Sequence, residues 1–277
     1  MSEVSEIDLV ILTYNREDTV GEALASVASW KFKRVICIDH HSTDRTIDIV
    51  KSFFPNVEVY YENAGLGYAR TLAISLVTSP FFFFLDSDVV LSHDYLNSLK
   101  ALMKPNVAAV HGTKETIHPI WKELMKTRLG STGVLERGGY RILRTNDRPF
   151  TGATLIRTGA AKGANLSKYK MWEDYFLMRY VQQKGFVWIQ AFMTVHLLEP
   201  ETIAYGNLRS KRDENEGAAM RKYGIRTPLQ FISEQVKYTI RDLFLAVKLG
   251  RLTYLSYVIR LHKSFVKGYL SPTRYLN

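Results

Sequence analysis

The sequence predicts an α/β protein with a mostly parallel central sheet, helices on both faces and a helical appendage at the C-terminus. Short apolar segments alternate with amphipathic ones through the first half of the chain, a pattern typical of a parallel sheet. Residues 80–85 are uncharged and rich in Phe, as expected for a strand buried on both faces. Polar residues directly follow three predicted strands, which is where open sheets bind ligands.

Each element has its own signal. Strands are expected at 7–12, 34–39, 57–61, 81–85 and 107–110 and near 186–189. Helices are expected at 19–30, 67–77 and 95–103, from a cap at Ser42 or Thr43 to residue 54, and over 175–181. Thr19 and Glu22 have the spacing of a capping box, which predicts where the first helix begins.

The composition is that of an ordinary globular protein of 277 residues, with 46% hydrophobic and 23% charged residues. Its single cysteine, Cys37, excludes a disulfide framework and a Cys-based zinc site, and favours a reducing compartment. We do not expect the polar, acidic start to be a signal peptide, and no apolar run approaches the roughly 20 residues of a spanning helix. We expect a cytoplasmic protein.

The net charge of +10 is concentrated in the last quarter of the chain. Residues 205–277 hold 14 Lys or Arg and five Asp or Glu, a net charge of +9, against +1 for residues 1–204. The sequence therefore predicts a domain at 1–204 and a basic region at 205–277. The excess points to an anionic partner for that region: a membrane surface, a nucleic acid or an acidic neighbour.

Three loops are expected to converge at the carboxyl ends of the strands. They are Thr13-Tyr14-Asn15-Arg16, the segment from Asp39 to Asp44, and Asp86-Ser87-Asp88. The carboxylates of Asp86 and Asp88 are close in sequence and repel each other unless a cation lies between them. A divalent ion that also binds a substrate phosphate suits this position. With a stackable Tyr and an acceptor at Asp39, the set suits a nucleotide. The alternative is simple turn and cap chemistry.

Several other residues each allow a structural and a functional interpretation. Glu173 and Asp174 either decorate the N-terminus of a helix or supply a general base. His196 is either structural or a third metal ligand. Arg70 faces solvent or binds a diphosphate, and its position breaks the Gly-rich dinucleotide pattern after Gly65.

The basic C-terminal region is expected to contain two amphipathic helices. Thr227-Pro228 is a helix start, and apolar residues at 232, 236, 240, 243 and 247 share one face up to a stop at Gly250. A second helix is expected over 252–267. Their apolar faces either dock on the protein's own domain or lie on anionic lipid at the inner face of a membrane. Residues 205–226 are expected to form a polar lid loop.

Together these motifs resemble the family 2 glycosyltransferases of the GT-A fold over about residues 7–200. The markers are Thr13 to Arg16, Asp39 with Ser42 to Asp44, Gly65 and Gly67 with Arg70, Leu85 to Asp88, Gly152 with Arg157, and Glu173-Asp174. The resemblance implies an inverting enzyme that transfers one sugar from a nucleotide-diphosphate sugar, UDP- or GDP-linked, to an acceptor hydroxyl. The acceptor would be a growing glycan or a lipid-linked carrier.

The resemblance also implies residue roles. Thr13, Tyr14, Asn15 and Arg16 would line the base pocket, with Asp39, Arg70, Asp86 and Ser87 completing the donor site. Asp88 would bind Mn²⁺ or Mg²⁺ on the diphosphate, and Asp86 would contact the ribose or the metal; His196 is the further metal ligand that the sequence itself offers. Asp174 would be the catalytic base beside Glu173, and Gly152 and Trp172 would lie on the acceptor side.

The chain departs from the family pattern at two points. His40 and His41 replace the usual second acid and Gly or Asn after Asp39, which leaves the choice between uracil and guanine open. The Gln-x-x-Arg-Trp motif of processive synthases is absent, which favours a single transfer. Residues 114–149 are expected to help read the acceptor. A nucleic-acid-binding protein would explain the basic region but leaves the three loops unused, and a nucleotidyltransferase would want a Gly-rich first loop.

Overall fold

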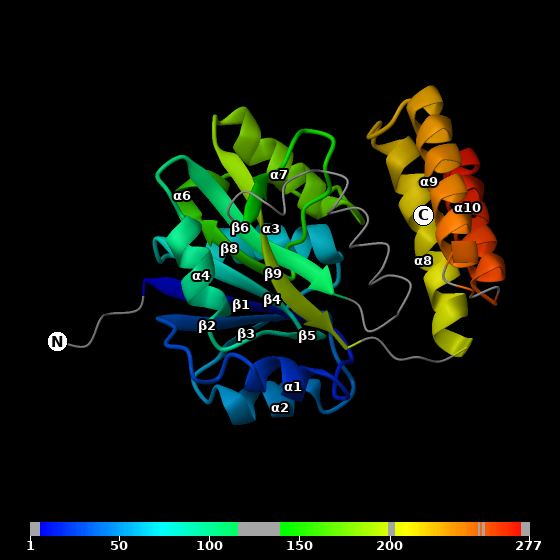
Figure 1. The fold of residues 1–277 in the computed structure, drawn as a ribbon. Coiled ribbons are helices and arrows are strands. Elements are labelled where there is room, and N and C mark those ends of the chain that lie inside the picture. Colours follow the sequence, from blue (N-terminus) through cyan, green and yellow to red (C-terminus); the bar gives the residue numbers. More distant parts are fainter. Residues whose placement is uncertain (1–5, 116–138, 199–202, 249, 251–252, 273–277) are drawn as a thin grey trace. The chain divides into compact units, whose positions relative to one another are not determined.

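The structure is a computed structural model that describes residues 6–115, 139–198, 203–248, 250 and 253–272 (Figure 1). Most of the segment expected to read the acceptor lies outside these residues. The chain divides into two compact units, one of Met1–Tyr169 with Glu173–Glu199, the other of Lys170–Trp172 with Pro200–Asn277. The predicted division after residue 204 stays a prediction.

Four parallel strands form one side of the sheet in the first unit. In spatial order they are β3 (Glu58–Tyr61), β2 (Arg34–Asp39), β1 (Ile7–Thr13) and β4 (Phe81–Asp86). The register pairs Thr13 with Asp39 and Asp39 with Tyr61, and sets Leu12 beside Asp86. Because these strands end level with one another, the residues after them share one edge, which we call the carboxyl edge.

The rest of the sheet mixes directions. Its strands are β8 (Ala153–Arg157), β6 (Val107–Glu115), β9 (Val187–Leu197), β5 (Val89–Val90) and β7 (Tyr140–Ile142). β8 is antiparallel to both β4 and β6, while β6 and β9 are parallel to each other. The predicted, mostly parallel sheet flanked by helices is confirmed, and the differences are β8, antiparallel to β4 and β6, and the short β5 and β7, antiparallel to β9. Apolar patterning specifies a buried strand but not its direction, which depends on the long connection that precedes it.

Both faces of the sheet are buried, as the Phe-rich β4 predicts. Leu9 and Ile11 of β1 pack in one core with Leu24 and Leu99. The alternate residues Val10, Phe82 and Phe84 face the other way and are also fully buried. The covering helices are α1 (Val20–Ala25), α2 (Thr46–Phe53), α3 (Leu66–Leu76), α4 (Tyr95–Leu102), α6 (Thr158–Ala161) and α7 (Glu173–Gln183).

One predicted capping bond and one predicted helix start are wrong. Thr19 is the N-cap of α1, but its side chain makes no capping bond, so the capping box does not form. The second helix begins at Thr46 and not at Ser42 or Thr43, because the Ser42 side chain donates to Asp39 while Asp44 accepts the Thr46 backbone N–H at 3.0 Å. Local side chain to backbone bonds of this kind compete with helix formation.

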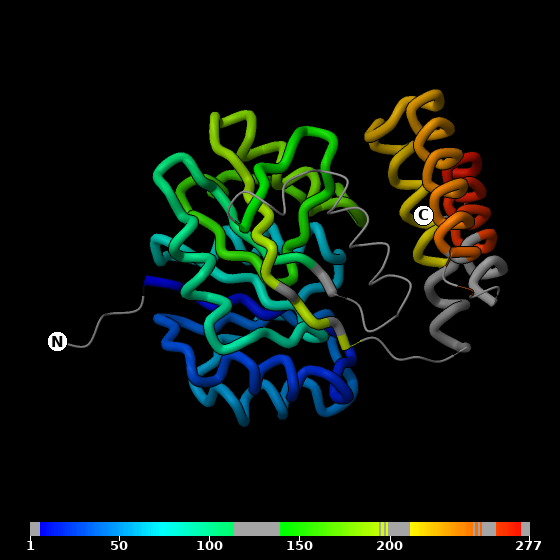
Figure 2. The backbone as a smooth tube through the Cα atoms, viewed as in Figure 1, coloured from blue at the N-terminus to red at the C-terminus, as the bar shows by residue number. Residues whose placement is uncertain are grey.

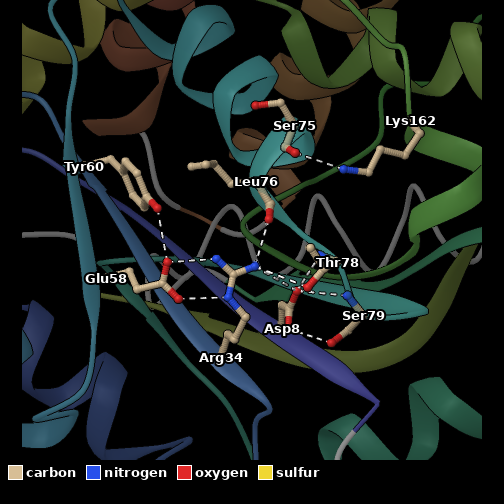
Figure 3. Close-up of polar contacts among 9 residues, drawn as sticks. All are labelled: Asp8, Arg34, Glu58, Tyr60, Ser75, Leu76, Thr78, Ser79 and Lys162. Atoms are coloured by element: carbon tan, nitrogen blue, oxygen red, sulfur yellow. Dashed lines mark hydrogen bonds and ion pairs between the residues drawn. The ribbon is translucent and has the colours of Figure 1, made fainter.

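A polar network ties the amino ends of the strands together, far along each strand from the carboxyl edge (Figure 3). Arg34 donates to both Glu58 oxygens at 2.8 Å and to the Leu76 carbonyl at 2.8 Å. The buried Asp8 accepts from the Ser79 hydroxyl at 2.6 Å. The hydrogen bonds from Arg34 hold the pKa of Glu58 below its ordinary value. These pairs support the scaffold and not a site.

The second unit contains three long helices, α8 (Ile203–Lys222), α9 (Pro228–Lys248) and α10 (Thr253–Leu270). α9 begins as predicted, since Thr227 Oγ1 accepts from Gln230 N at 3.3 Å and Gln230 Oε1 accepts from Thr227 N at 3.0 Å. Figure 2 shows α9 and α10 running side by side. None of the helices within the described ranges is long and apolar enough to cross a membrane.

The predicted lid at residues 205–226 is wrong, since most of it forms α8. A Cβ on Gly217 would lie 2.1 Å from the Phe265 carbonyl oxygen, and one on Gly268 would meet the Glu214 backbone. The glycines therefore allow α8 and α10 to pack backbone against backbone. The segment 205–226 suggested a loop because it is polar and contains glycine. Gly217 is instead explained by the close packing of α8 against α10.

Candidate active site

The loops after β1 and β2 are interlocked at the carboxyl edge. Asn15 N donates to Ser42 Oγ at 2.8 Å, and Thr43 N donates back to Asn15 Oδ1 at 2.8 Å. Asn15 and His41 have φ values of 47° and 55°, a left-handed conformation that is uncommon for non-glycine residues and that Asn and His adopt more readily than most. The predicted Thr13–Arg16 and Asp39 loops are thus brought together. Tyr14 is exposed, whereas the Thr13 side chain is buried.

Asp39 organises its own loop. The side chain is fully buried, Oδ2 accepts from Ser42 N at 2.7 Å and Oδ1 from Ser42 Oγ at 2.5 Å. These bonds turn the chain sharply after β2. The contact of Asp39 with a base or ribose stays a prediction.

The sequence analysis overlooked a His–Glu pair beside Tyr14. His40 Nδ1 lies 2.8 Å from Oε1 of the buried Glu62, whose Oε2 accepts from Ala64 N and Gly65 N at 2.8 Å each. The ring of Tyr14 meets His40 edge-on with centroids 5.1 Å apart. Glu62 directly follows β3, so the rule that points to polar residues after strands could have found it.

A buried arginine joins three elements at the centre of the carboxyl edge. Arg70 of α3 is 2% exposed, its Nε lies 3.1 Å from Oε1 of Glu173, and its Nη2 lies 3.6 Å from Oδ1 of Asp86. The guanidinium also covers the ring of Phe84, 4.9 Å from its centroid. Within the described residues, Nη1 of Arg70 has no hydrogen-bond partner. Arg70 therefore points inward, and an unsatisfied buried N–H is suited to an anionic ligand.

The two acids predicted for catalysis begin α7. Glu173 is buried, and its burial together with the adjacent Asp174 charge raises its pKa above the ordinary value, an effect that Arg70 partly offsets. Asp174 Oδ1 accepts from Tyr175 N at 2.7 Å, and Oδ2 lies 3.6 Å from Nε of Arg148. Arg148 is a second residue that the sequence analysis missed; no local pattern distinguishes it.

Position 152 requires glycine because the Asp86 carboxylate approaches its backbone closely. Its carbonyl accepts from Asp86 N at 2.8 Å, and a Cβ at this position would lie 2.2 Å from Asp86 Oδ2. The glycine thus leaves room for the Asp86 carboxylate at the junction of β4 and β8. Trp172, the other residue predicted on the acceptor side, belongs to the second unit, is buried and has a φ of 64°.

The Asp86-Ser87-Asp88 turn offers oxygen donors for a hard cation. The Asp86 side chain is 31% exposed and Asp88 is half-buried. His196 is exposed on β9 opposite Val90. Across the residues that the structure describes, no group of three or more His, Cys, Asp or Glu side chains is gathered as metal ligands. Two carboxylates still fit Mg²⁺ or Mn²⁺, because such ions often take one or two protein carboxylates plus substrate phosphates.

Comparison with known proteins bears on the fold first. The structure resembles the mannosyltransferase PcManGT from Pyrobaculum calidifontis in complex with GDP-Man and Mn²⁺, with a TM-score of 0.67 and 15% identity over 98% of this chain and 88% of that one. It also resembles glucosyl-3-phosphoglycerate synthase from Mycobacterium tuberculosis with Mn²⁺ and UDP-glucose, with a TM-score of 0.56 and 16% identity over 80% of each chain. The chain is thus a GT-A fold protein, as predicted.

Sequence comparison then gives the family. Residues 8–162 match the family described as "Glycosyl transferase family 2", so the chain belongs to glycosyl transferase family 2, a family of glycosyltransferase enzymes. It is 36% identical over 95 residues to glycosyltransferase SunS of Bacillus subtilis strain 168, and 27% identical over 166 residues to the uncharacterized glycosyltransferase YibD of Escherichia coli K12. These matches cover 34% and 54% of this chain, but only 22% of SunS and 47% of YibD.

Proposed function

We propose that the protein is an inverting glycosyltransferase that moves one sugar from a nucleotide-diphosphate sugar to an acceptor hydroxyl. The observation that carries the proposal is the Arg70 ion-pair centre, which joins the Asp86 turn to the helix that begins with Glu173 and Asp174. It lies at one edge of the sheet and includes a carboxylate suited to a cation, an inward arginine and the helix that begins with the candidate base. The family match does not favour the nucleic-acid-binding alternative.

In the proposed mechanism the donor binds at the carboxyl edge, with its base near Tyr14 and its diphosphate near Asp86 and Arg70. Asp86 and Asp88 would hold Mn²⁺ or Mg²⁺, which when bound neutralises charge on the leaving diphosphate. Asp174 removes the proton of the acceptor hydroxyl as that oxygen attacks the anomeric carbon on the face opposite the leaving group. This single displacement inverts the anomeric centre, and no covalent intermediate is needed.

The similar structures support the donor class. PcManGT is in complex with GDP-Man and Mn²⁺, and the mycobacterial synthase with UDP-glucose and Mn²⁺. The acceptor in our proposal is a growing glycan or a lipid-linked carrier. One relative is a poly(ribitol-phosphate) beta-glucosyltransferase, which is in keeping with a polymeric acceptor. We also propose that the basic region at 205–277 is a separate domain that binds an anionic membrane surface.

Thermal shift against UDP, GDP, CDP and dTDP sugars, with and without Mn²⁺, tests the donor class. A ligand that binds the native state raises the melting temperature, so one nucleotide is expected to give a rise that depends on Mn²⁺. Asp88→Ala should lose the Mn²⁺-dependent part, whereas Asp94→Ala, whose side chain is 84% exposed, should keep it. No rise with any nucleotide would refute the proposed donor.

A further inference from the structure

α9 carries an apolar stripe on the face turned away from its helical partner. The stripe consists of exposed large side chains at spacings of three and four residues, so they lie on one side of the helix. Their exposed fractions range from 54% to 81%, and the residues are Leu229, Ile232, Val236, Ile240, Phe244 and Val247. Since α9 has 21 residues, the stripe runs along a helix of about 30 Å. Isolated apolar residues on a surface need no explanation, but a continuous stripe does.

The opposite face of α9 already accounts for the packing of the unit. Phe231 is buried and stacks on Tyr269 of α10 with ring centroids 3.8 Å apart. Asp242 is buried, and its Oδ2 lies 3.3 Å from Nε2 of His262 of α10. Leu245 is also buried. The stripe is therefore surplus to the packing of α9 against α10.

The charges beside the stripe are basic. Lys237, Arg241 and Lys248 recur at intervals of four and seven, which places them along one flank of the stripe. The acids of α9 are Glu234, which accepts from Arg226 at 2.9 Å, and Asp242, which contacts Arg241 and His262. Arg226 neutralises Glu234 and Arg241 neutralises Asp242, so Arg241 adds no net charge, and the exposed Lys237 and Lys248 are the cations that flank the stripe.

We propose that this face of α9 is a docking surface for an anionic lipid bilayer, with the helix lying along the interface. An apolar face flanked by Lys and Arg is what such a position requires: the apolar residues enter the acyl boundary and the cations meet the head groups. A second copy of the chain would suit the stripe less well, because it would bring two basic flanks together. The inference deepens the proposed function, since a lipid-linked acceptor would be presented at that same surface.

Sedimentation with vesicles tests the proposal on the full-length protein. Vesicles of phosphatidylcholine with phosphatidylglycerol should bind the protein, pure phosphatidylcholine should bind it at least tenfold more weakly, and added salt should release it. Ile240→Glu should weaken binding to the anionic vesicles about tenfold or more, because it places a charge in the middle of the stripe. Ile142→Glu is the matched control: Ile142 is 54% exposed on β7 in the first unit, against 64% for Ile240, and this variant should bind like the wild type.

A charge variant separates the basic flank from the stripe. Lys237→Glu should weaken binding to anionic vesicles about tenfold, while Lys51→Glu on the exposed surface of α2 should not. Wild-type binding by both Ile240→Glu and Lys237→Glu would overturn the proposal, as would a failure of the wild type to bind anionic vesicles. A stable dimer that Ile240→Glu dissociates would instead assign the stripe to a second copy. Thermal shift with the sugar nucleotide should be unchanged in these variants, which keeps this test separate from the donor test.

Discussion

Nε of Arg70 lies 3.1 Å from Oε1 of Glu173. This ion pair joins α3 to α7, although the two residues are 103 positions apart in the sequence. Both side chains are buried. Removing one partner of a buried pair leaves an uncompensated charge, which costs more than the pair contributes. The pair therefore fixes where α7 begins relative to β4, and so where Asp174 stands relative to Asp86.

Asp174→Asn should abolish transfer while leaving donor binding intact. The amide keeps the shape of the side chain but cannot take a proton, and loss of a general base costs about 100-fold or more in rate. We expect the turnover number to fall by that factor, with the dissociation constant of the sugar nucleotide within about threefold of wild type. Asp94→Asn, at an exposed position, should behave like the wild type. Near-normal turnover in Asp174→Asn would remove Asp174 from the mechanism.

Gly152→Ala should damage the site through Asp86. The new methyl group would lie 2.2 Å from Asp86 Oδ2, so either the carboxylate or the strand must move. We expect a loss of about 1–3 kcal/mol in the free energy of unfolding and at least a tenfold loss of Mn²⁺-dependent donor affinity. Gly159→Ala is the control, since nothing lies within 4 Å of its Cβ position; within α6 it should be neutral or stabilising by up to about 1 kcal/mol. Equal behaviour of the two variants would contradict the crowding argument.

His40→Ala should alter the choice of nucleotide base. The buried Glu62 carboxylate accepts a bond from His40 Nδ1, so in the neutral ring Nε2 is left as an acceptor. We expect about tenfold weaker binding of the preferred nucleotide and a smaller ratio between UDP- and GDP-sugar affinities, measured by calorimetry. His93→Ala, with a side chain 81% exposed, provides the comparison. An unchanged ratio would exclude His40 from base recognition.

Glu173 should make unfolding depend on pH in a defined direction. Burial first, and then the Asp174 charge, raise the pKa of Glu173 above 4.5 in the native state. The native protein therefore holds this proton to higher pH than the unfolded chain does. As pH rises from 4.5 through the raised native pKa, this group makes the free energy of unfolding fall.

Glu173→Gln should lack that component. Its free energy of unfolding, relative to wild type, should increase by on the order of 1 kcal/mol across this pH range. Urea unfolding at a series of pH values measures the difference. A difference that stays constant with pH would show that the native environment does not raise the pKa of Glu173.

Much of the secondary structure could be predicted from local pattern. The buried runs of β1, β2 and β4 are apolar enough to be strands, and Thr227 caps α9 because its hydroxyl faces the Gln230 N–H three residues on. The carboxyl-edge rule then placed Thr13, Asp39 and Asp86 together, and the register confirms that their strands end level. These features follow from residues close in sequence or from a general property of parallel sheets.

The sequence by itself determined which segments are buried, where polar loops end the strands, and the excess of positive charge after residue 204. Only the tertiary structure decided that β8 runs antiparallel beside β4, that α8 is a helix packed on α10 through glycine, and that Arg70 binds Glu173. The physical reason is how far apart in the sequence the interacting residues lie. Patterning and capping act within a turn or a strand, whereas strand direction, backbone approach and buried ion pairs depend on residues tens to more than a hundred positions apart, as the 103 positions between Arg70 and Glu173 illustrate.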